Sequence, residues 1–285
     1  MTVGRLLVVG TPIGNLGDLT PRAADALRTA DLVVAEDTRL AARLLAHVGA
    51  RTPSLSFNEH NGAARLPGLL ARLAAGETLA LTTDAGMPGV SDPGAALVAA
   101  AREAGAAIEV VPGPAAVTAA IALSGVEAPG FVFGGFLPSR PASARGRALD
   151  RLLEAATSAE LPLVLYEAPH RMTSLLAALS ERVPVAVVAA ARELTKRHEE
   201  VLVGAPAEVA ARLGSPRGEF TVVVSGLPAA ASGGDAADAA ALVEVGRREA
   251  LSDRTLVALL RAIGLSRRDA YRLVEAHRKA PVSRR

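Results

Sequence analysis

Three short segments rich in glycine and proline hold the residue types that most clearly suggest ligand chemistry. Each segment follows an apolar, strand-like run and leads into a helix-like stretch. The segments are residues 10–21 (GTPIGNLGDLTP), 82–94 (TTDAGMPGVSDPG) and 110–116 (VVPGPAA). The carboxyl ends of parallel strands meet at one edge of a sheet, where open α/β sheets bind ligands. We therefore expect the three loops to lie side by side at such an edge.

The first two loops suggest an adenosyl ligand better than a triphosphate. Gly10, Gly14 and Gly17 form the pattern G-x3-G-x2-G, which is close to but not the dinucleotide fingerprint G-x-G-x-x-G, and no G-K-[ST] of a phosphate-binding loop follows. Asp84 places a carboxylate directly after a strand, with glycines beyond it. Rigid backbone donors and acceptors beside Asp84 suit a neutral or cationic ligand. Asp92 has an alternative role, because an Asp-Pro pair is also a good helix start.

Composition excludes several classes of site. The chain has no cysteine, which excludes disulfides, thiolate zinc sites and a cysteine nucleophile. The loops offer no cluster of metal ligands, so we predict no metal. No apolar run reaches the ~18 to 20 residues that span a bilayer, and the first apolar stretch is shorter than the roughly 7 to 15 residues of a signal peptide core. We expect a cytoplasmic protein without a membrane partner.

Strand-like and helix-like segments alternate along most of the chain, which predicts an α/β protein. In the first part the alternation indicates βαβ units and a largely parallel sheet. Later strand-like runs have little helix between them, which predicts a mixed second sheet. At 285 residues, about two domains are expected. We divide the chain into an N-terminal α/β domain (1–113), a second α/β domain (114–227), a linker (228–241) and a small basic helical domain (242–285).

Charge is unevenly distributed along the chain. The formal net charge is +2, yet residues 242–285 alone contain eleven Lys or Arg and five Asp or Glu. Such asymmetry suggests a polyanionic partner for the C-terminal helices. A solvated helical face is the equally weighted alternative.

Seven motifs in order give the chain a family resemblance. They are TPIGNLGDLTPRA, AEDTR, DAGMPGVSDPG, VPGPAA, GFLP, YEAPHR and ARELTK. Together they resemble the tetrapyrrole-methylase superfamily and, more narrowly, the ribosomal RNA small subunit methyltransferase I family. The resemblance implies a cleft between two α/β domains that binds S-adenosyl-L-methionine. It also implies a homodimer that methylates the ribose 2′-hydroxyl of a cytidine in the decoding region of 16S rRNA, with the 30S subunit as the expected context.

The resemblance also implies which residues contact the cofactor, largely through their backbone. In the first domain these are Pro12, Asp84, Ala85, Gly86, Met87, Ser91 and Asp92. Ala115 and Ala116 follow VPGP, where tetrapyrrole-type members carry hydroxyl residues, so a side-chain hydrogen bond is not expected there. In the second domain the expected contacts are Tyr166, Ala191, Arg192 and Thr221.

The general base is not fixed by the resemblance. A ribose hydroxyl is a weak nucleophile near neutral pH, so a nearby base would help. We take His60, Glu193 and Lys196 as the catalytic candidates. Glu36 and Asp37 of AEDTR, and Glu59 next to His60, are the other candidate carboxylates. Histidine generally titrates near neutral pH, which favours His60, and our hypothesis is that His60 orients the nucleotide together with Arg39 and Lys196. A surface-loop histidine and a structural Glu193–Lys196 ion pair are the alternatives.

Arginines supply the expected contacts to RNA phosphates. Beside Arg39, one group lies in PSRPASARGRALDR, which we interpret as a flexible loop and helix start, and the other in LSRRDAYRLV of the basic tail. The candidates are Arg140, Arg145, Arg147, Arg267, Arg268 and Arg272.

Other functions compatible with these patterns are a methylase of a tetrapyrrole or other small acceptor, and a non-catalytic RNA-binding assembly factor. The basic tail argues against the first, and only a turnover measurement separates the second. A nucleotide hydrolase fits poorly, because the loops lack a phosphate-binding lysine and clustered metal carboxylates.

Overall fold

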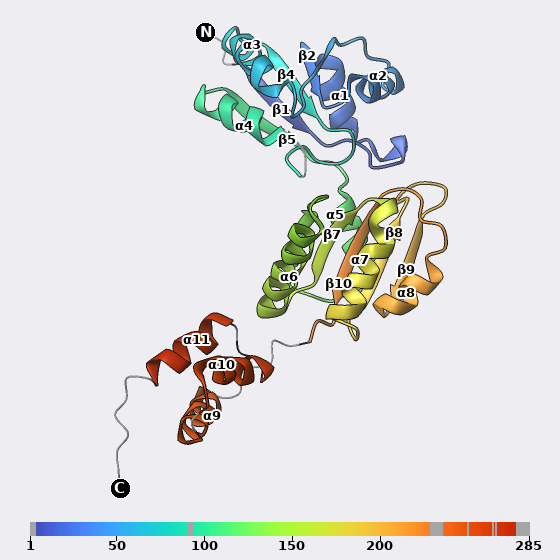
Figure 1. The fold of residues 1–285 in the computed structure, drawn as a ribbon. Coiled ribbons are helices and arrows are strands. Elements are labelled where there is room, and N and C mark those ends of the chain that lie inside the picture. Colours follow the sequence, from blue (N-terminus) through green and yellow to red (C-terminus); the bar gives the residue numbers. More distant parts are fainter. Residues whose placement is uncertain are drawn as a thin grey trace.

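The structure is a computed structural model that describes residues 4–90, 94–228, 236–249, 251–263, 265 and 267–277. The chain forms two successive α/β units followed by a small group of helices (Figure 1). Among the described helices, none is long and apolar enough to cross a membrane.

The first unit is a five-stranded sheet in which all the strand pairs are parallel, as predicted. Its strand order is β3-β2-β4-β1-β5. The strands are β1 (Arg5–Val9), β2 (Leu32–Ala35), β3 (Ser54–Ser56), β4 (Thr78–Thr82) and β5 (Ala107–Val111), and the helices are α1 (Pro21–Thr29), α2 (Thr38–His47), α3 (Gly62–Ala74) and α4 (Gly94–Glu103), with a short 3₁₀ turn η1 (Leu16–Asp18).

Alternate residues of the central strands point to opposite faces, and each face is covered by two helices. Leu7 and Val33 pack with the apolar side of α1 and α2, while Leu6 and Val34 pack with α3 and α4. All four residues of β2 are buried, as expected for a parallel sheet covered on both sides.

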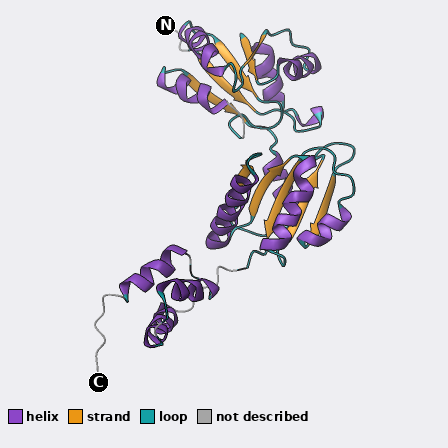
Figure 2. Cartoon of the chain, viewed as in Figure 1, coloured by secondary structure: helices purple, strands orange, loops and turns teal. Residues whose placement is uncertain are grey.

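The second unit is a mixed sheet, which also agrees with the prediction. Its order is β6-β7-β10-β8-β9, with β6 parallel to β7 and the remaining pairs antiparallel. Helix α5 covers one face, and α6, α7 and α8 pack on the other (Figure 2). The strands are β6 (Val132–Phe136), β7 (Leu163–Glu167), β8 (Val187–Arg192), β9 (Glu200–Gly204) and β10 (Phe220–Ser225), and the helices are α5 (Ala116–Ser124), α6 (Ala142–Ala159), α7 (Pro169–Arg182) and α8 (Pro206–Arg212).

The C-terminal helices α9 (Ala236–Arg248), α10 (Asp253–Ala262) and α11 (Arg267–Ala276) share a core of their own, which includes Val243, Leu256 and Val274. Helix α9 begins within residues 228–241, so the predicted linker extended too far toward the C-terminus. The segment is rich in alanine. Alanine is common in linkers of small residues, but it also has the highest helix propensity of all residues.

The three glycine-rich loops lie side by side at one edge of the first sheet, as predicted. The backbone of Thr11 exchanges hydrogen bonds of 2.8 and 3.1 Å with Gly86. The Gly10 N–H donates to the Val111 carbonyl at 2.9 Å. A Cβ added to Gly10 would lie 2.6 Å from the backbone nitrogen of Gly113, so two of the loops touch backbone to backbone.

We predict that Gly10→Ala destabilises the protein by about 1–3 kcal/mol, because the new methyl group overpacks backbone that cannot turn away. Gly68→Ala is the matched control, since it lies in α3 with no atom within 4 Å of the added Cβ. The control is expected to be neutral or stabilising by about 0.5–1 kcal/mol. Urea unfolding followed by circular dichroism measures both, and equal effects would contradict the close approach of the loops.

Candidate functional site

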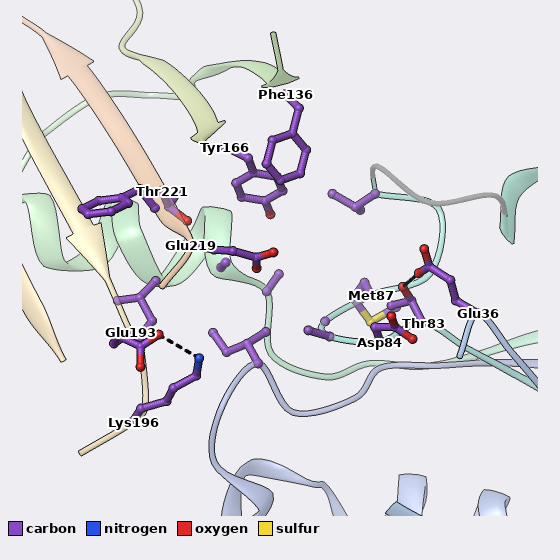
Figure 3. Close-up of a pocket in the computed structure, with 18 residues that line it drawn as sticks. Glu36, Thr83, Asp84, Met87, Phe136, Tyr166, Glu193, Lys196, Glu219 and Thr221 are labelled. Atoms are coloured by element: carbon purple, nitrogen blue, oxygen red, sulfur yellow. Dashed lines mark hydrogen bonds and ion pairs between the residues drawn. The ribbon is translucent and has the colours of Figure 1, made fainter. Parts of the chain in front are cut away.

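A pocket of about 270 Å³ lies between the two α/β units and is lined by residues of both. Figure 3 shows side chains from the two units facing one another across it. It brings together ten predicted site residues: Asp84, Ala85, Gly86, Met87, Ala115, Ala116, Tyr166, Glu193, Lys196 and Thr221. Its other lining residues are Ile13, Glu36, Thr83, Val90, Phe136, Leu194, Glu219 and Phe220, of which only Glu36 had been considered from the sequence.

Two hydrogen bonds tie together the loops that follow β2 and β4, which are neighbouring strands. The Asp84 carboxylate accepts the Asp37 backbone N–H at 3.0 Å, and the Thr83 hydroxyl donates to the Glu36 carboxylate at 3.0 Å. Burial raises the pKa of Asp84 above its ordinary value. By contrast, the hydrogen bond from the Arg39 side chain lowers the pKa of Asp37 to about 2. Asp84 is therefore the carboxylate of this pair that is protonated at the higher pH.

The loop after β8 approaches the first unit closely. A Cβ on Gly14 would lie 2.7 Å from the Leu194 carbonyl oxygen, so only glycine fits there without a shift of backbone. Glu193 and Thr195 adopt positive φ angles of 51° and 65°. For a β-branched residue such as Thr195 this conformation is a genuine outlier, and outliers of this kind cluster at functional sites. Lys196 Nζ forms an ion pair with the Glu193 carboxylate at 2.9 Å.

Aromatic rings form the side of the pocket at the ends of β6 and β7. The Tyr166 ring lies 5.4 Å from that of Phe136 and meets Phe133 edge-on at 5.0 Å. Burial raises the pKa of the Tyr166 hydroxyl, which favours its neutral form. This side of the pocket therefore offers apolar ring faces and a neutral hydroxyl group.

The charge of the lining residues is predominantly negative. The lining includes the carboxylates of Glu36, Asp84, Glu193 and Glu219, whereas Lys196 is the one basic side chain among the described lining residues. Such a pocket attracts a cationic ligand and disfavours a polyphosphate. Within the described part of the chain, no group of three potential metal ligands gathers.

Three predicted cofactor contacts do not line the pocket. Pro12 precedes the lining residue Ile13, and Ala191 is buried inside β8. Arg192 forms an ion pair with Glu200 at 2.6 Å and lies over the Phe220 ring. Contact of these three residues with the cofactor remains a prediction. Ser91 and Asp92 lie outside the described residues.

His60 is exposed and is not among the lining residues. It follows β3, the edge strand of the first sheet, and β2 separates β3 from β4. Strand order, which the motif did not reveal, therefore keeps His60 apart from Asp84. The other two catalytic candidates, Glu193 and Lys196, do line the pocket.

The predicted RNA-binding arginines differ in their surroundings. Arg39, Arg140, Arg147 and Arg272 are exposed, although Arg39 also pairs with Asp37 at 2.6 Å. Their contact with RNA remains a prediction. The side chains of Arg267 and Arg268 lie outside the described residues.

Arg145 requires a correction. The sequence suggested a flexible arginine, but its side chain is only 15% exposed and pairs with Glu167 at 2.7 Å. Arg171 forms an ion pair with the other oxygen of the same carboxylate at 2.7 Å and donates to the Leu137 carbonyl at 3.3 Å. Glu167 is fully buried. This cluster joins α6, α7 and the ends of β6 and β7, next to the lining residues Phe136 and Tyr166.

Comparison with known proteins gives consistent results. Residues 5–210 match the family of tetrapyrrole (corrin/porphyrin) methylases. The chain is 44% identical over 230 residues to a ribosomal RNA small subunit methyltransferase I from Synechocystis sp., covering 79% of this chain and 80% of the relative. A protein with the same description from Micromonospora olivasterospora is 40% identical over 275 residues, covering 95% of this chain and 86% of the relative.

Among solved structures, a uroporphyrin-III C-methyltransferase from Thermus thermophilus in complex with S-adenosyl homocysteine superposes with a TM-score of 0.55. It is 19% identical and covers 79% of this chain and 98% of that one. At this identity the likeness confirms the fold alone.

We predict that Glu167→Gln lowers the free energy of unfolding by about 3–5 kcal/mol, because two largely covered guanidinium groups lose the buried carboxylate that is their counter-charge. Glu244→Gln is the matched control, since Glu244 pairs with Arg248 at 3.4 Å on an exposed surface. The control should change stability by no more than about 1 kcal/mol. Chemical denaturation compares them, and similar small losses in both variants would show that the cluster is not a structural centre.

Proposed function

The chain belongs to the tetrapyrrole methylase family and, within it, to the ribosomal RNA small subunit methyltransferase I family, and from this premise we propose its reaction. It transfers the methyl group of S-adenosyl-L-methionine to the ribose 2′-hydroxyl of a cytidine in the decoding region of 16S rRNA. The observation that carries this proposal is the 40–44% identity, over most of both chains, to relatives described as ribosomal RNA small subunit methyltransferase I.

The chemistry of the pocket fits the cofactor. Its carboxylates suit a sulfonium cation, and Ile13, Met87 and Leu194 offer apolar contact beside them. Asp84 through Met87, Ala115, Ala116, Tyr166 and Thr221 would hold the cofactor. When bound, S-adenosyl-L-methionine supplies an activated methyl group on a good leaving group.

Positioning is then the main task of this chain. A displacement needs the acceptor oxygen aligned within a near-attack geometry, and alignment alone can supply a large share of the rate. Rigid loops that touch backbone to backbone meet this need. Glu193 and Lys196 line the pocket as an ion pair, and we propose that the Lys196 ammonium orients the acceptor hydroxyl while the Glu193 carboxylate accepts its proton.

The acceptor RNA is proposed to lie across the pocket, with its phosphates on exposed arginines. Arg39, Arg140, Arg147 and Arg272 provide such positive charge. We further propose that the 30S subunit is the physical substrate, that the reaction takes place in the cytoplasm and that the chain acts as a homodimer.

Incubation of the protein with methyl-labelled S-adenosyl-L-methionine and either free 16S rRNA or assembled 30S subunits tests the function. Nuclease mapping should locate the label on the ribose of one cytidine. Label on a base or on a small acceptor would overturn the proposal, and absence of transfer would favour an assembly factor.

Asp84→Asn should weaken S-adenosyl-L-methionine binding about tenfold, or ~1.4 kcal/mol, because the amide retains the bond to Asp37 but loses the negative charge. Burial raises the pKa of Asp84 above 3.8. The affinity of the wild type for S-adenosyl-L-methionine should therefore be highest above this raised pKa and decline as the pH falls through it. The decline should begin at a higher pH than it would for an aspartate of ordinary pKa. Calorimetry as a function of pH measures this decline.

The Asn variant should lack this acid decline. Asp25→Asn, an exposed residue of α1 that pairs with Arg28, is the control and should bind as the wild type does. A parallel decline in wild type and Asp84→Asn would assign the pH dependence to another group.

A chain that ends at residue 228 should bind S-adenosyl-L-methionine normally, because α9–α11 have a separate core. Its RNA affinity should fall, and the salt slope should become shallower by roughly 0.7–0.9 for each phosphate that the shortened chain no longer neutralises. Filter binding at several salt concentrations measures both. Failure of the shortened chain to bind the cofactor would contradict this division of labour.

A further inference from the structure

Phe136 is an aromatic side chain that is exposed inside a pocket. The chain contains only seven aromatic residues, and three of them, Phe136, Tyr166 and Phe220, line this pocket. Phe136 is 45% exposed, more than any other large apolar side chain in the lining. It is the C-terminal residue of β6, and Figure 3 shows its ring directed toward the pocket.

The Phe136 ring is supported from behind, which leaves an accessible face. Tyr166 packs against it with ring centres 5.4 Å apart, and Phe133 in turn packs against Tyr166. The buried cluster of Glu167, Arg145 and Arg171 fixes the strand ends that carry these rings. A rigid, half-exposed ring of this kind is a stacking platform for a nucleobase, worth roughly 1–3 kcal/mol per base.

Glu219 adds a hydrogen-bond acceptor on the same side of the pocket. It precedes β10, which pairs with β7, and Figure 3 shows its carboxylate close to the Tyr166 side chain. The other lining carboxylates are engaged: Glu193 with Lys196, Glu36 with Thr83 and Asp84 with the Asp37 N–H. Within the described part of the chain, Glu219 forms no hydrogen bond or ion pair and is exposed.

We propose that Phe136 and Glu219 form the subsite for the acceptor nucleobase. The Phe136 ring stacks on the base, and the Glu219 carboxylate accepts a hydrogen bond from its exocyclic amino group. A carboxylate accepts from the N4 amino group of cytosine, whereas uracil presents an oxygen acceptor at the same position and is repelled. The inference rests on the proposed function and adds to it the means by which a cytidine is selected.

The location of the two residues favours the acceptor over the cofactor as their ligand. Both lie on the side of the second unit, across the pocket from Asp84 and Met87 (Figure 3). Phe136 is also the most exposed large apolar side chain of the lining, which makes it accessible to an acceptor that arrives from solvent.

The test uses 30S subunits that carry either C or U at the acceptor position. Phe136→Leu should lower kcat/KM on the C substrate about 5- to 100-fold, because the stacking surface is removed. Glu219→Gln should lower kcat/KM on C and reduce the preference for C over U at least about tenfold, because its amide can donate to the uracil oxygen. Both variants should bind S-adenosyl-L-methionine within about twofold of wild type.

Phe131→Leu and Glu154→Gln are the matched controls, since both residues are exposed and neither lines the pocket. They should leave kcat/KM and the C-over-U preference unchanged. If wild type methylates the C substrate but the test variants behave like the controls, the subsite is wrong while the proposed function stands. If either test variant weakens cofactor binding more than tenfold, that residue belongs to the cofactor site and the inference is overturned. Inactivity of the wild type itself would instead refute the proposed function.

Discussion

Backbone contact between loops that follow different strands is the constraint on which the pocket depends. Gly10 and Gly113 touch with no side chain between them, and Gly14 meets the Leu194 carbonyl across the two units. The Thr11–Gly86 bridge adds hydrogen bonds to this framework. A wall built of paired backbone cannot change its shape through rotamer changes. The carboxylates and rings that project from it are therefore held on a nearly fixed frame.

Much of this arrangement could be predicted from local sequence. Alternating strand and helix patterns indicated the parallel first sheet, and the strand-end rule placed the three glycine-rich loops together with Asp84 facing a ligand site. The later strand-like segments have little helix between them, and this predicted the mixed second sheet. These features follow from periodicity and turn chemistry, which are recognised within a few residues.

What could not be predicted depends on contacts between distant segments. His60 does not line the pocket, because it follows β3, the edge strand of the first sheet. The order of strands in a sheet cannot be deduced from a single motif. The Arg145 side chain is largely covered because it pairs with Glu167, a residue 22 positions away in the sequence. Phe136 at the end of β6 and Glu219 just before β10 reach the same pocket because both strands pair with β7, one parallel and one antiparallel. The sequence around each of these residues does not reveal such contacts between distant segments.

The charges in and around the pocket act differently on the parts of the two substrates. Four carboxylates line the pocket, and positive side chains such as Arg140 and Arg147 are exposed outside its lining. Two like charges about 4 Å apart near a protein surface repel by roughly 4 kcal/mol, so a phosphodiester entering the pocket would be strongly disfavoured. A sulfonium cation would be attracted by the same field. An uncharged ribose and base would enter with neither effect. On the proposed function, the electrostatic field of the lining carboxylates would therefore favour binding of the cofactor and allow entry of the nucleoside. The same field would keep the RNA phosphates outside the pocket, near the exposed arginines.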